Sequence, residues 1–402
     1  MAKRVLLVNK FYYPRGGDCI VVINTEALLR ENGFEAEVFA MEYPQNMKAR
    51  YQAMFASEVN FGGGVRNQLQ AMSRTLGKDN VKSRFEAVLD EFQPDVVHLH
   101  NIHSYLSPVV GQLAHQRGIR VVWTLHDYKL LCPRYDCLLS GKPCERCHQG
   151  SKLNVVTHKC MKNSLPASIV AWLEALKWNR STLEKFTDVF VCPSQFIADK
   201  MRAGGFNPSK IKVLNNFLDT VKLQRYQDMD KGTEPRQDYY CYVGRLAPEK
   251  GVESLLAAAS RLPYRLKIAG GGPLETELRD KYGNNTNTDF LGSLDADEVA
   301  QLLAGAQFSV MPSQCYDNNP LSVVESLCAG TPVAGAHIGG IPELIDSING
   351  ITFAPFDTKA LSEAISAAMS REWDHSAIAN KALQRFSPTT HLHTLLKDIY
   401  SL

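Results

Sequence analysis

The chain has 402 residues, of which 45% are hydrophobic and 21% charged, and its formal net charge is +2. This composition is typical of a globular protein, and the length exceeds one ordinary core, so we expect two domains. The near-neutral charge gives no support for nucleic-acid binding, which usually shows a concentrated basic surplus. No apolar run approaches the roughly 18 residues of a membrane span or, near the start, the roughly 7–15 of a signal peptide. We therefore expect a cytoplasmic protein whose ten cysteines are reduced thiols or metal ligands.

The first half alternates short apolar strands with helical segments. Residues 5–8 are apolar, Gly16 and Gly17 follow in a turn, and residues 18–31 have a helical pattern. Further strands are expected at 95–100, 121–125 and 189–192. Near-continuous apolar strands that alternate with helices indicate a parallel sheet covered on both faces.

A cysteine-rich insert, residues 132–160, interrupts this pattern. Cys144 and Cys147 have the spacing of half a zinc site, and Cys160 with either Cys132 or Cys137 would complete it. The insert is rich in turns and poor in apolar residues, so a metal would supply order that a core does not. We expect a structural zinc ion here, with unligated thiols as the alternative.

A helix is expected at 164–186, after the insert. Its apolar positions are interspersed with Lys177, Arg180 and Lys185. Such a stripe usually faces a core, and contact with a membrane surface is the alternative.

The pattern of strands and helices restarts in the second half, with strands expected at 241–244, 266–269, 308–311 and 332–335. A polar stretch at 222–239 separates the halves. We expect two doubly wound, Rossmann-like α/β domains at 1–210 and 220–385, and a last helix at 386–402 that packs back on the first domain or, as the alternative, on the second. Ligands of such sheets bind at the carboxyl ends of the strands, which would face a central cleft.

The stretch 313–330 carries two acids around a helix start. Asn319 is a good N-cap, Pro320 suits the first helical position, and Gly330 suits the end. The free N–H groups at such a helix start attract anions, and Asp317 and Glu325 are placed to accept hydrogen bonds from hydroxyl groups. The alternative is that Asp317 is a turn acid and Glu325 a surface residue.

Two further loops each follow an expected strand. Residues 244–251 present Arg245 and Lys250, which suit phosphate oxygens, and residues 269–273 contain three consecutive glycines, Gly271 among them. The dinucleotide fingerprint is absent, because its third glycine would fall at Glu275.

Taken together, these stretches resemble glycosyltransferase family 4, whose members are retaining enzymes of the two-domain GT-B fold. The resemblance covers nearly the whole chain and rests on the loop at 244–251, the turn at 269–273, the acid-x7-Glu element at 317–325 and the segments 329–332 and 339–343. It implies that Arg245 and Lys250 hold a donor diphosphate, that Glu325 binds the ribose, and that the first acid lies near the donor sugar. The family usually has glutamate where this chain has the shorter Asp317.

The resemblance also assigns roles in the first half. Gly16 and Gly17 match a loop that lets the backbone approach donor and acceptor, and His126 stands where members carry a histidine that faces the reacting sugar. The implied catalytic residues are therefore His126, Asp317 and Gly17, and the implied donor-binding residues are Gly16, Arg245, Lys250, Gly271, Asn319, Pro320, Leu321 and Glu325.

The implied reaction moves a sugar from a nucleotide-diphosphate sugar to a hydroxyl acceptor with retention. The expected acceptor is a saccharide or lipid-linked saccharide of surface polysaccharide synthesis, which would bring the protein to the inner face of a membrane. Catalysis would require no cofactor. A nucleotide-sugar epimerase of the same fold and a nucleotide-binding protein with a decayed site are the alternatives.

Overall fold

The computed structural model describes residues 3–61, 65–229 and 236–402. They divide into two compact units, each with its own core. The first unit consists of Met1–Cys137, Cys144–Asn215 and His391–Leu402, and the second of Leu138–Pro143 and Asn216–Thr390.

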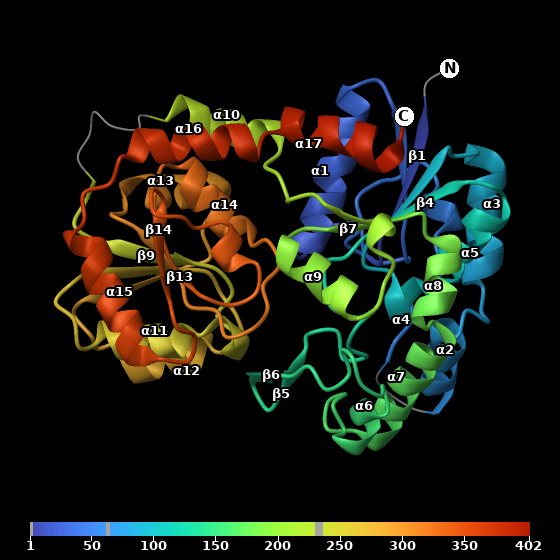
Figure 1. Cartoon of the computed structure of the whole chain (residues 1–402), viewed down its shortest axis with the longest axis horizontal. Coiled ribbons are helices and arrows are strands. Elements are labelled where there is room, and N and C mark those ends of the chain that lie inside the picture. Colours follow the sequence, from blue (N-terminus) through green and yellow to red (C-terminus); the bar gives the residue numbers. More distant parts are fainter. Residues whose placement is uncertain (1–2, 62–64, 230–235) are drawn as a thin grey trace. The chain divides into compact units, whose positions relative to one another are not determined.

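The first unit is built on a six-stranded parallel sheet in the order β2-β1-β3-β4-β7-β8. Its strands are β1 Arg4–Val8, β2 Glu35–Phe39, β3 Val96–Leu99, β4 Arg120–Thr124, β7 Val189–Cys192 and β8 Ile211–Val213. Residues 5–8 and 121–123 are fully buried, as expected of strands covered on both faces. Helix α1 Gly17–Glu31 lies on one side of the sheet, and α3 Val81–Phe92 and α5 Val109–Gln116 lie on the other (Figure 1).

The second unit repeats this architecture with the order β11-β10-β9-β12-β13-β14, again all parallel. The strands are β9 Tyr240–Val243, β10 Leu266–Ala269, β11 Thr288–Gly292, β12 Ser309–Met311, β13 Val333–Ala336 and β14 Gly350–Phe353. Helices α13 Ala296–Gly305, α14 Leu321–Cys328 and α16 His375–Arg385 cover one face, and α11 Val252–Ala259, α12 Glu275–Tyr282 and α15 Thr358–Ser370 cover the other (Figure 1). Two doubly wound α/β units confirm the predicted fold class.

Shorter elements connect these layers. In the first unit they are η1 Gln52–Met54, α2 Val65–Thr75, α4 His103–Leu106, α6 Asn154–Thr157, α7 Leu165–Lys177, α8 Arg180–Phe186, α9 Gln195–Ala203 and η2 Pro208–Lys210. The others are the hairpin β5 Leu138–Leu139 with β6 Lys142–Pro143, and α10 Thr220–Asp228, η3 Pro248–Lys250 and η4 Ile341–Glu343.

The single helix predicted at 164–186 is wrong, because the structure has two helices there. Trp178 leaves the helical conformation, and the Asn179 side chain caps α8 by accepting a hydrogen bond from Thr182 N. On α7 the residues that are buried are Ser168, Ala171 and Glu174. The predicted apolar stripe is therefore partly exposed on this helix.

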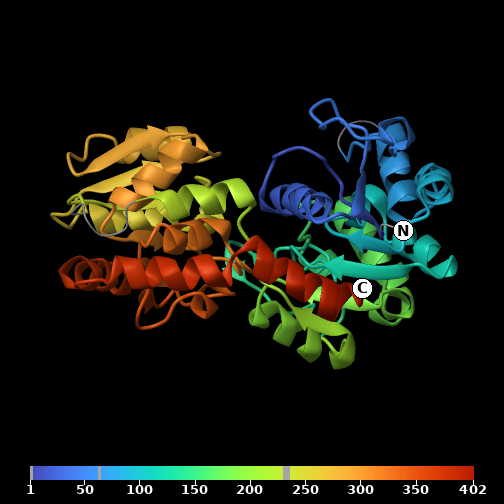
Figure 2. The ribbon, with the colours of Figure 1, turned by 90° about the horizontal axis from the view of Figure 1, so that it is seen from above.

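The end of the chain returns to the first unit, which is one of the two places expected for it. Helix α17 Pro388–Thr394 continues into a π-helical turn at Leu395–Tyr400, which lies against the strands of the first unit (Figure 2). The Arg120 guanidinium donates two hydrogen bonds to Ile399 O, at 3.0 and 2.8 Å. Strand β4 is thereby fastened to the last turn of the chain.

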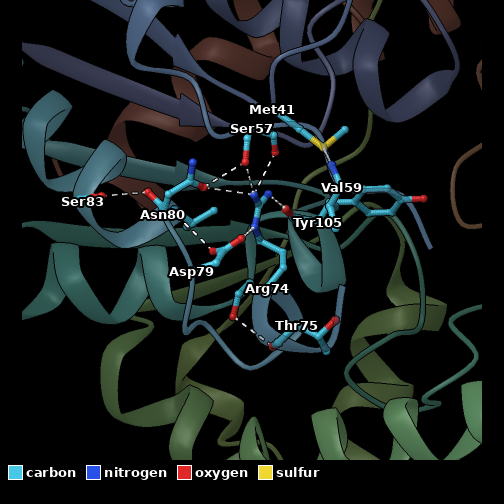
Figure 3. A network of polar contacts seen from close by, with 11 residues as sticks. Met41, Ser57, Val59, Arg74, Thr75, Asp79, Asn80, Ser83 and Tyr105 are labelled. Carbon is cyan, nitrogen blue, oxygen red and sulfur yellow. Dashed lines mark hydrogen bonds and ion pairs between the residues drawn. The ribbon is translucent and has the colours of Figure 1, made fainter. Parts of the chain in front are cut away.

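A fully buried arginine joins four segments of the first unit (Figure 3). Arg74, at the end of α2, donates to Tyr105 O (2.8 Å), Ser57 O (2.9 Å) and Asn80 Oδ1 (3.3 Å), and it pairs with Asp79. Because a buried guanidinium is tolerated when all its donors are engaged, this network fixes the loops around it.

In residues 3–61, 65–229 and 236–402, no helix combines the length and apolar character needed to cross a membrane.

Candidate functional site

The strand order of the second unit identifies where a ligand is expected to bind. From β9 the chain proceeds to β10 and β11 on one side and later to β12, β13 and β14 on the other, so the order reverses between β9 and β12. Ligands of open α/β sheets bind outside the carboxyl ends of the strands at such a reversal. The loops that leave β9 and β12 are residues 244–251 and 312–320.

The loop after β9 is held in one conformation by its last glycine. Gly251 has φ of 68°, and a Cβ atom there would lie 2.0 Å from Pro312 O, so no other residue fits. The loop closes through η3, and the Arg245 carbonyl accepts a hydrogen bond from the Tyr242 hydroxyl at 2.9 Å. Arg245 and Lys250 are therefore presented from a fixed backbone at the reversal point.

Lys250 and Asp317 form an ion pair with 2.5 Å between Nζ and Oδ1. Asp317 also accepts a hydrogen bond from the Ser313 hydroxyl. Burial opposes the charge on Lys250, but the Asp317 carboxylate outweighs it and the pKa of Lys250 is raised. The pair brings the two sequence-predicted loops together at one place.

The glycine turn after β10 adjoins the same loop. A Cβ atom on Gly270 would lie 2.0 Å from Gly244 O, and one on Gly272 would lie 2.4 Å from Leu246 O. These two glycines therefore allow the turn to pack against the loop after β9. A Cβ atom on Gly271 would meet only side chains, at 3.2 Å or more, so this position faces a less crowded space.

The predicted capping of the following helix is wrong by one residue. Helix α14 begins at Leu321, its N-cap is Pro320, and no side chain caps it. Asn319 is buried, and its Oδ1 accepts a hydrogen bond from Asn216 N at 3.0 Å, which makes the amide unavailable as a cap. The first N–H groups of α14 thus keep their capacity to bind an anion.

Glu325 lies inside α14 and is 9% exposed. Its carboxylate pairs with Lys222 Nζ on α10, a partner from 103 residues earlier in the chain. The interpretation of Glu325 as a surface residue is therefore wrong. Both acids of the stretch 313–330 have a lysine partner in this structure.

The first unit has its own reversal point, between β1 and β3. The loop after β1 carries Gly16, the N-cap of α1, and Gly17, its first residue. Gly16 has an extended backbone, and a Cβ atom on Gly17 would meet nothing within 4 Å. The local backbone does not demand these glycines, and their absent side chains leave open space at the start of α1.

Asp18 lies in the first turn of α1 and is held by both neighbouring loops. It accepts a hydrogen bond from Asn101 Nδ2 at 2.9 Å and lies 3.4 Å from Lys10 Nζ. Burial works against the ionised carboxylate, but Lys10, His126 and Asn101 together lower the pKa of Asp18 to about 2. A permanent negative charge therefore stands beside His126.

His126 follows β4 and is part of a row of histidines. Its Nε2 lies 2.9 Å from Nδ1 of His100, whose ring lies 4.2 Å from that of His98. Burial lowers the pKa of His126 despite the opposing fields of Asp18 and Asp127, so the imidazole is neutral at pH 7. His98 in turn contacts Thr124 Oγ1 and the Tyr400 hydroxyl, each at 2.7 Å.

His100 is the middle residue of this row, and its two ring nitrogens differ in their surroundings. Its ring is buried, and Nε2 has no hydrogen-bond partner in the described part of the chain. Because Nδ1 is shared with His126, the protonation of one ring sets the tautomer of the other. His100 is therefore placed to orient His126.

The cysteine-rich insert brings the thiols of Cys132, Cys137 and Cys147 together. The thiols of Cys137 and Cys147 donate hydrogen bonds to Cys132, which lowers the pKa of Cys132. Cys144 and Cys160 are half-buried, and burial together with the nearby Cys132 and Cys144 raises the pKa of Cys160. Across the described residues, no three His, Cys, Asp or Glu side chains are placed to hold an ion. The structural zinc at Cys132, Cys144, Cys147 and Cys160 stays a prediction.

Several polar residues at these two places were missed by sequence reasoning. Lys222 pairs with Glu325, the charge of Asp18 acts on His126, and the Tyr400 hydroxyl contacts His98 in the row of histidines. Asp18 carried a usable signal, since an acid in the first helical turn after two glycines marks a helix start. The sequence around Lys222 and Tyr400 gives no such signal, because only folding brings Lys222 near Glu325 and Tyr400 near His98.

Comparison with known proteins agrees with the geometry. The model of Glycosyltransferase Family 4 matches residues 16–222, and that of Glycosyl transferases group 1 matches residues 225–385. The chain is 29% identical over 208 residues to the sulfoquinovosyl transferase SQD2 of Arabidopsis thaliana, covering 48% of this chain and 40% of that protein. It is 26% identical over 363 residues to an uncharacterized 42.6 kDa protein in the cps region of Klebsiella pneumoniae, covering 87% and 89%.

Solved structures share the fold. HepE of Anabaena, in a crystal structure with UDP-glucose, has a TM-score of 0.65 and 18% identity, and the match covers 99% of this chain and 100% of that one. The two parallel-sheet units and the loops at their reversal points thus define a glycosyltransferase of the GT-B fold. The chain belongs to glycosyltransferase family 4.

Proposed function

We propose that the protein transfers a sugar from a nucleoside-diphosphate sugar to a hydroxyl group of a saccharide or lipid-linked saccharide, with retention at the anomeric carbon. The observation that carries this proposal is the placement of Lys250, Asp317 and the start of α14 around one strand-order reversal. A cation, an uncapped helix start and a carboxylate suit a diphosphate that carries a sugar. HepE, which shares the fold, binds UDP-glucose in its crystal structure.

Different residues of the second unit bind different parts of the donor. Arg245, Lys250 and the first N–H groups of α14 hold the diphosphate and stabilise the negative charge that develops as it leaves. Glu325 accepts hydrogen bonds from the ribose hydroxyls once Lys222 gives way, and Asp317 accepts one from the donor sugar. Gly271 leaves room for the nucleoside beside the turn after β10.

The transfer needs no nucleophile from the enzyme, because the bonds formed and broken balance between donor and acceptor. The bond from the anomeric carbon to the diphosphate oxygen breaks, and the acceptor hydroxyl oxygen bonds to the same face of that carbon. The hydroxyl proton passes to the departing phosphate. Neutral His126, with Asp18 beside it, stabilises the positive charge that develops on the sugar ring. Gly16 and Gly17 leave space for the backbone to approach the reactants.

A lipid-linked acceptor would bring the protein to a membrane surface. On α7 the side chains of Leu165, Ile169 and Leu176 are 46%, 38% and 48% exposed, and Lys177 lies on the same helix. Apolar side chains with a neighbouring lysine suit the interface of an anionic bilayer.

Calorimetric titration of UDP, GDP, ADP and NAD into the purified protein without added metal tests the donor assignment. We expect micromolar binding of one nucleoside diphosphate, lost in Lys250→Ala and kept in Lys359→Ala, a matched exposed lysine of the same unit. Binding of no diphosphate, or of NAD alone, would refute the proposal. A donor sugar returned with one inverted centre and no transfer would favour the epimerase.

A further inference from the structure

A pocket of about 550 Å³ lies within the first unit, beside the cysteine-rich insert. This insert pocket is lined by parts of the segments 129–133, 148–152, 174–180 and 203–206, together with two residues at the ends of α4. None of the candidate catalytic or donor-binding residues lines it. Its volume falls within the roughly 300–1,000 Å³ of pockets that bind small molecules. The chain therefore has a further place with room for a ligand.

The charged side chains on the walls of the insert pocket are mostly cationic. Lys129, Lys152 and Arg180 line it, and Glu174 is the one carboxylate among the lining residues that the structure describes. Glu174 is buried and already has partners, because its carboxylate lies 2.9 Å from Lys129 Nζ and accepts a hydrogen bond from the Ser104 hydroxyl at 2.9 Å. The excess of positive charge on the walls therefore comes from Lys152 and Arg180.

Arg180, at the start of α8, is the cation with the least compensation. Its guanidinium donates one hydrogen bond, from Nη1 to Gly204 O at 3.2 Å, and it belongs to no ion pair among the described residues. Gly205 has φ of 82°, and a Cβ atom there would lie 1.7 Å from the same Nη1. The missing side chain at Gly205 thus lets the guanidinium lie against this turn. Its other N–H groups are left for water or a ligand.

Lys152 contributes the second cation from within the insert. Its Nζ donates to the carbonyl oxygens of Leu131 and Cys147, which fix its position. The side chain is half-buried, and no carboxylate pairs with it in the described part of the chain. The neighbouring thiols of Cys132 and Cys147 offset part of its charge. Because an ammonium group has three donor hydrogens, one of them is left for a ligand.

Apolar side chains form much of the remaining wall. They include Leu131, Leu176, Trp178 and Phe206. Trp178 and Phe206 are buried, and Trp178 Nε1 donates to Thr75 O at 3.1 Å, which fixes the indole ring. A neutral apolar ligand would leave the cations unpaired, and a bare inorganic anion would leave the apolar wall without contacts. The insert pocket therefore suits a ligand that has both an anionic and an apolar part.

Two walls of the insert pocket also hold the loop that carries His126. The backbone N–H of Lys129 donates to Asp127 Oδ1 at 2.9 Å, while Nζ of the same residue pairs with Glu174. His103 lines the pocket, and its Nε2 lies 3.4 Å from the same Asp127 oxygen. A ligand that contacts Lys129 or His103 would therefore act on the residue next to His126.

We propose that the insert pocket binds an amphipathic anion, a phosphate or carboxylate joined to an apolar chain or ring, as an effector of the enzyme. The anionic group binds beside Arg180 and Lys152, and the apolar part lies along Trp178 and Phe206. Its source is a soluble metabolite or the head group of a lipid. The effect on turnover rests on the proposed function. The binding does not, because it depends only on the first unit.

Calorimetric titration of octyl phosphate into the purified full chain, below the concentration at which it forms micelles, tests the binding. Inorganic phosphate has the charge without the chain, and 1-octanol has the chain without the charge, so each should bind at least about tenfold more weakly. Arg180→Gln should lower the affinity for octyl phosphate about fivefold to tenfold. Arg84→Gln is the matched control, because Arg84 is also exposed and donates to one carbonyl. Lys250→Ala, in the candidate donor site, should bind octyl phosphate like the wild type.

The proposal is overturned if octyl phosphate binds no better than the two partial probes, or binds Arg180→Gln as tightly as the wild type. Loss of octyl phosphate binding in Lys250→Ala would overturn it as well, because the probe would then occupy the donor site. Leu176→Ser decides the matter if Arg180→Gln does not fold. It should weaken octyl phosphate about threefold and leave inorganic phosphate unchanged.

Two further measurements identify the source and the effect. Binding to vesicles that contain phosphatidylglycerol, reduced in Arg180→Gln, would indicate a lipid, whereas binding of octyl phosphate without binding to vesicles would indicate a soluble ligand. Saturating octyl phosphate should change kcat for sugar transfer at least about twofold in the wild type and not in Arg180→Gln, and an unchanged kcat would refute the effector role. Octyl phosphate binding through Arg180 in a protein that transfers no sugar would refute the proposed function and leave the insert pocket assigned.

Discussion

Replacing Asp317 by asparagine should tighten the binding of a free nucleoside diphosphate, although it removes a candidate catalytic residue. In the structure Lys250 is committed to Asp317, with 2.5 Å between their charged atoms. A diphosphate must therefore draw Lys250 away from an existing partner and approach a carboxylate of like charge. Asparagine keeps the size of the side chain but removes both obstacles.

The size of the effect follows from how far the pair is exposed. The side chains of Lys250 and Asp317 are 23% and 16% exposed, between the surface pairs that contribute little and the buried pairs that contribute much. Such a pair contributes about 1 kcal/mol, so the affinity for the diphosphate should rise about fivefold. Turnover of the nucleotide sugar should fall, because a neutral amide accepts a weaker hydrogen bond from the sugar than a carboxylate does.

The assay is calorimetric titration with whichever diphosphate binds the wild type, followed by turnover with its sugar conjugate. Asp317→Glu is the matched control, because it restores the charge and should return the affinity toward the wild-type value. Weaker diphosphate binding to Asp317→Asn would refute the reasoning, since it would mean that Asp317 orders Lys250 for the ligand rather than competing with it.

Three further predictions concern stability and metal. Arg74→Met should lower the free energy of unfolding by about 3–5 kcal/mol in urea, because Asp79 would be left without its buried partner, whereas Arg117→Met, at a surface pair, should cost less than 1 kcal/mol. Burial lowers the pKa of His98 to about 3 and of His391 to about 4, so the unfolded chain binds more protons below pH 6.5. Stability should be full above pH 6.5 and fall as pH decreases, by about 2 kcal/mol per histidine at pH 5, and an unchanged unfolding curve there would contradict the buried neutral rings. For the predicted zinc, we expect elemental analysis of the purified protein to find about one ion per chain, and less in Cys147→Ser. If the purified protein contains no zinc and a chelator leaves its free energy of unfolding unchanged, the zinc prediction is wrong.

The sheets and the loops of the candidate site could be predicted from the sequence because the patterns that indicate them are local. Buried parallel strands appear as short apolar runs, and glycines mark where a loop must pass close to another backbone, as Gly251 does against Pro312. Both features depend on a few adjacent residues. Because Arg245, Lys250 and Asp317 lie in loops that directly follow predicted strands, their place at the carboxyl ends of the sheet could be predicted too.

The errors arose where a distant residue decided a local outcome. Asn319 has the chemistry of an N-cap, but Asn216 takes its amide oxygen, and the helix starts at Leu321 without a side-chain cap. Asn179 ends the predicted long helix because it caps the next one. Intrinsic preference allows either outcome at such residues, and the tertiary contact that selects one of them leaves no mark in the neighbouring sequence.

The return of the chain to the first unit has a consequence for the order of synthesis. The second unit consists of residues 138–143 and 216–390, so its whole sequence has been made before Tyr400 is added. His98 and Arg120, in contrast, acquire their partners Tyr400 and Ile399 only at the last turn. During synthesis these two contacts of the N-terminal sheet, one of them in its row of histidines, can therefore form only after the residues of the second unit have been made.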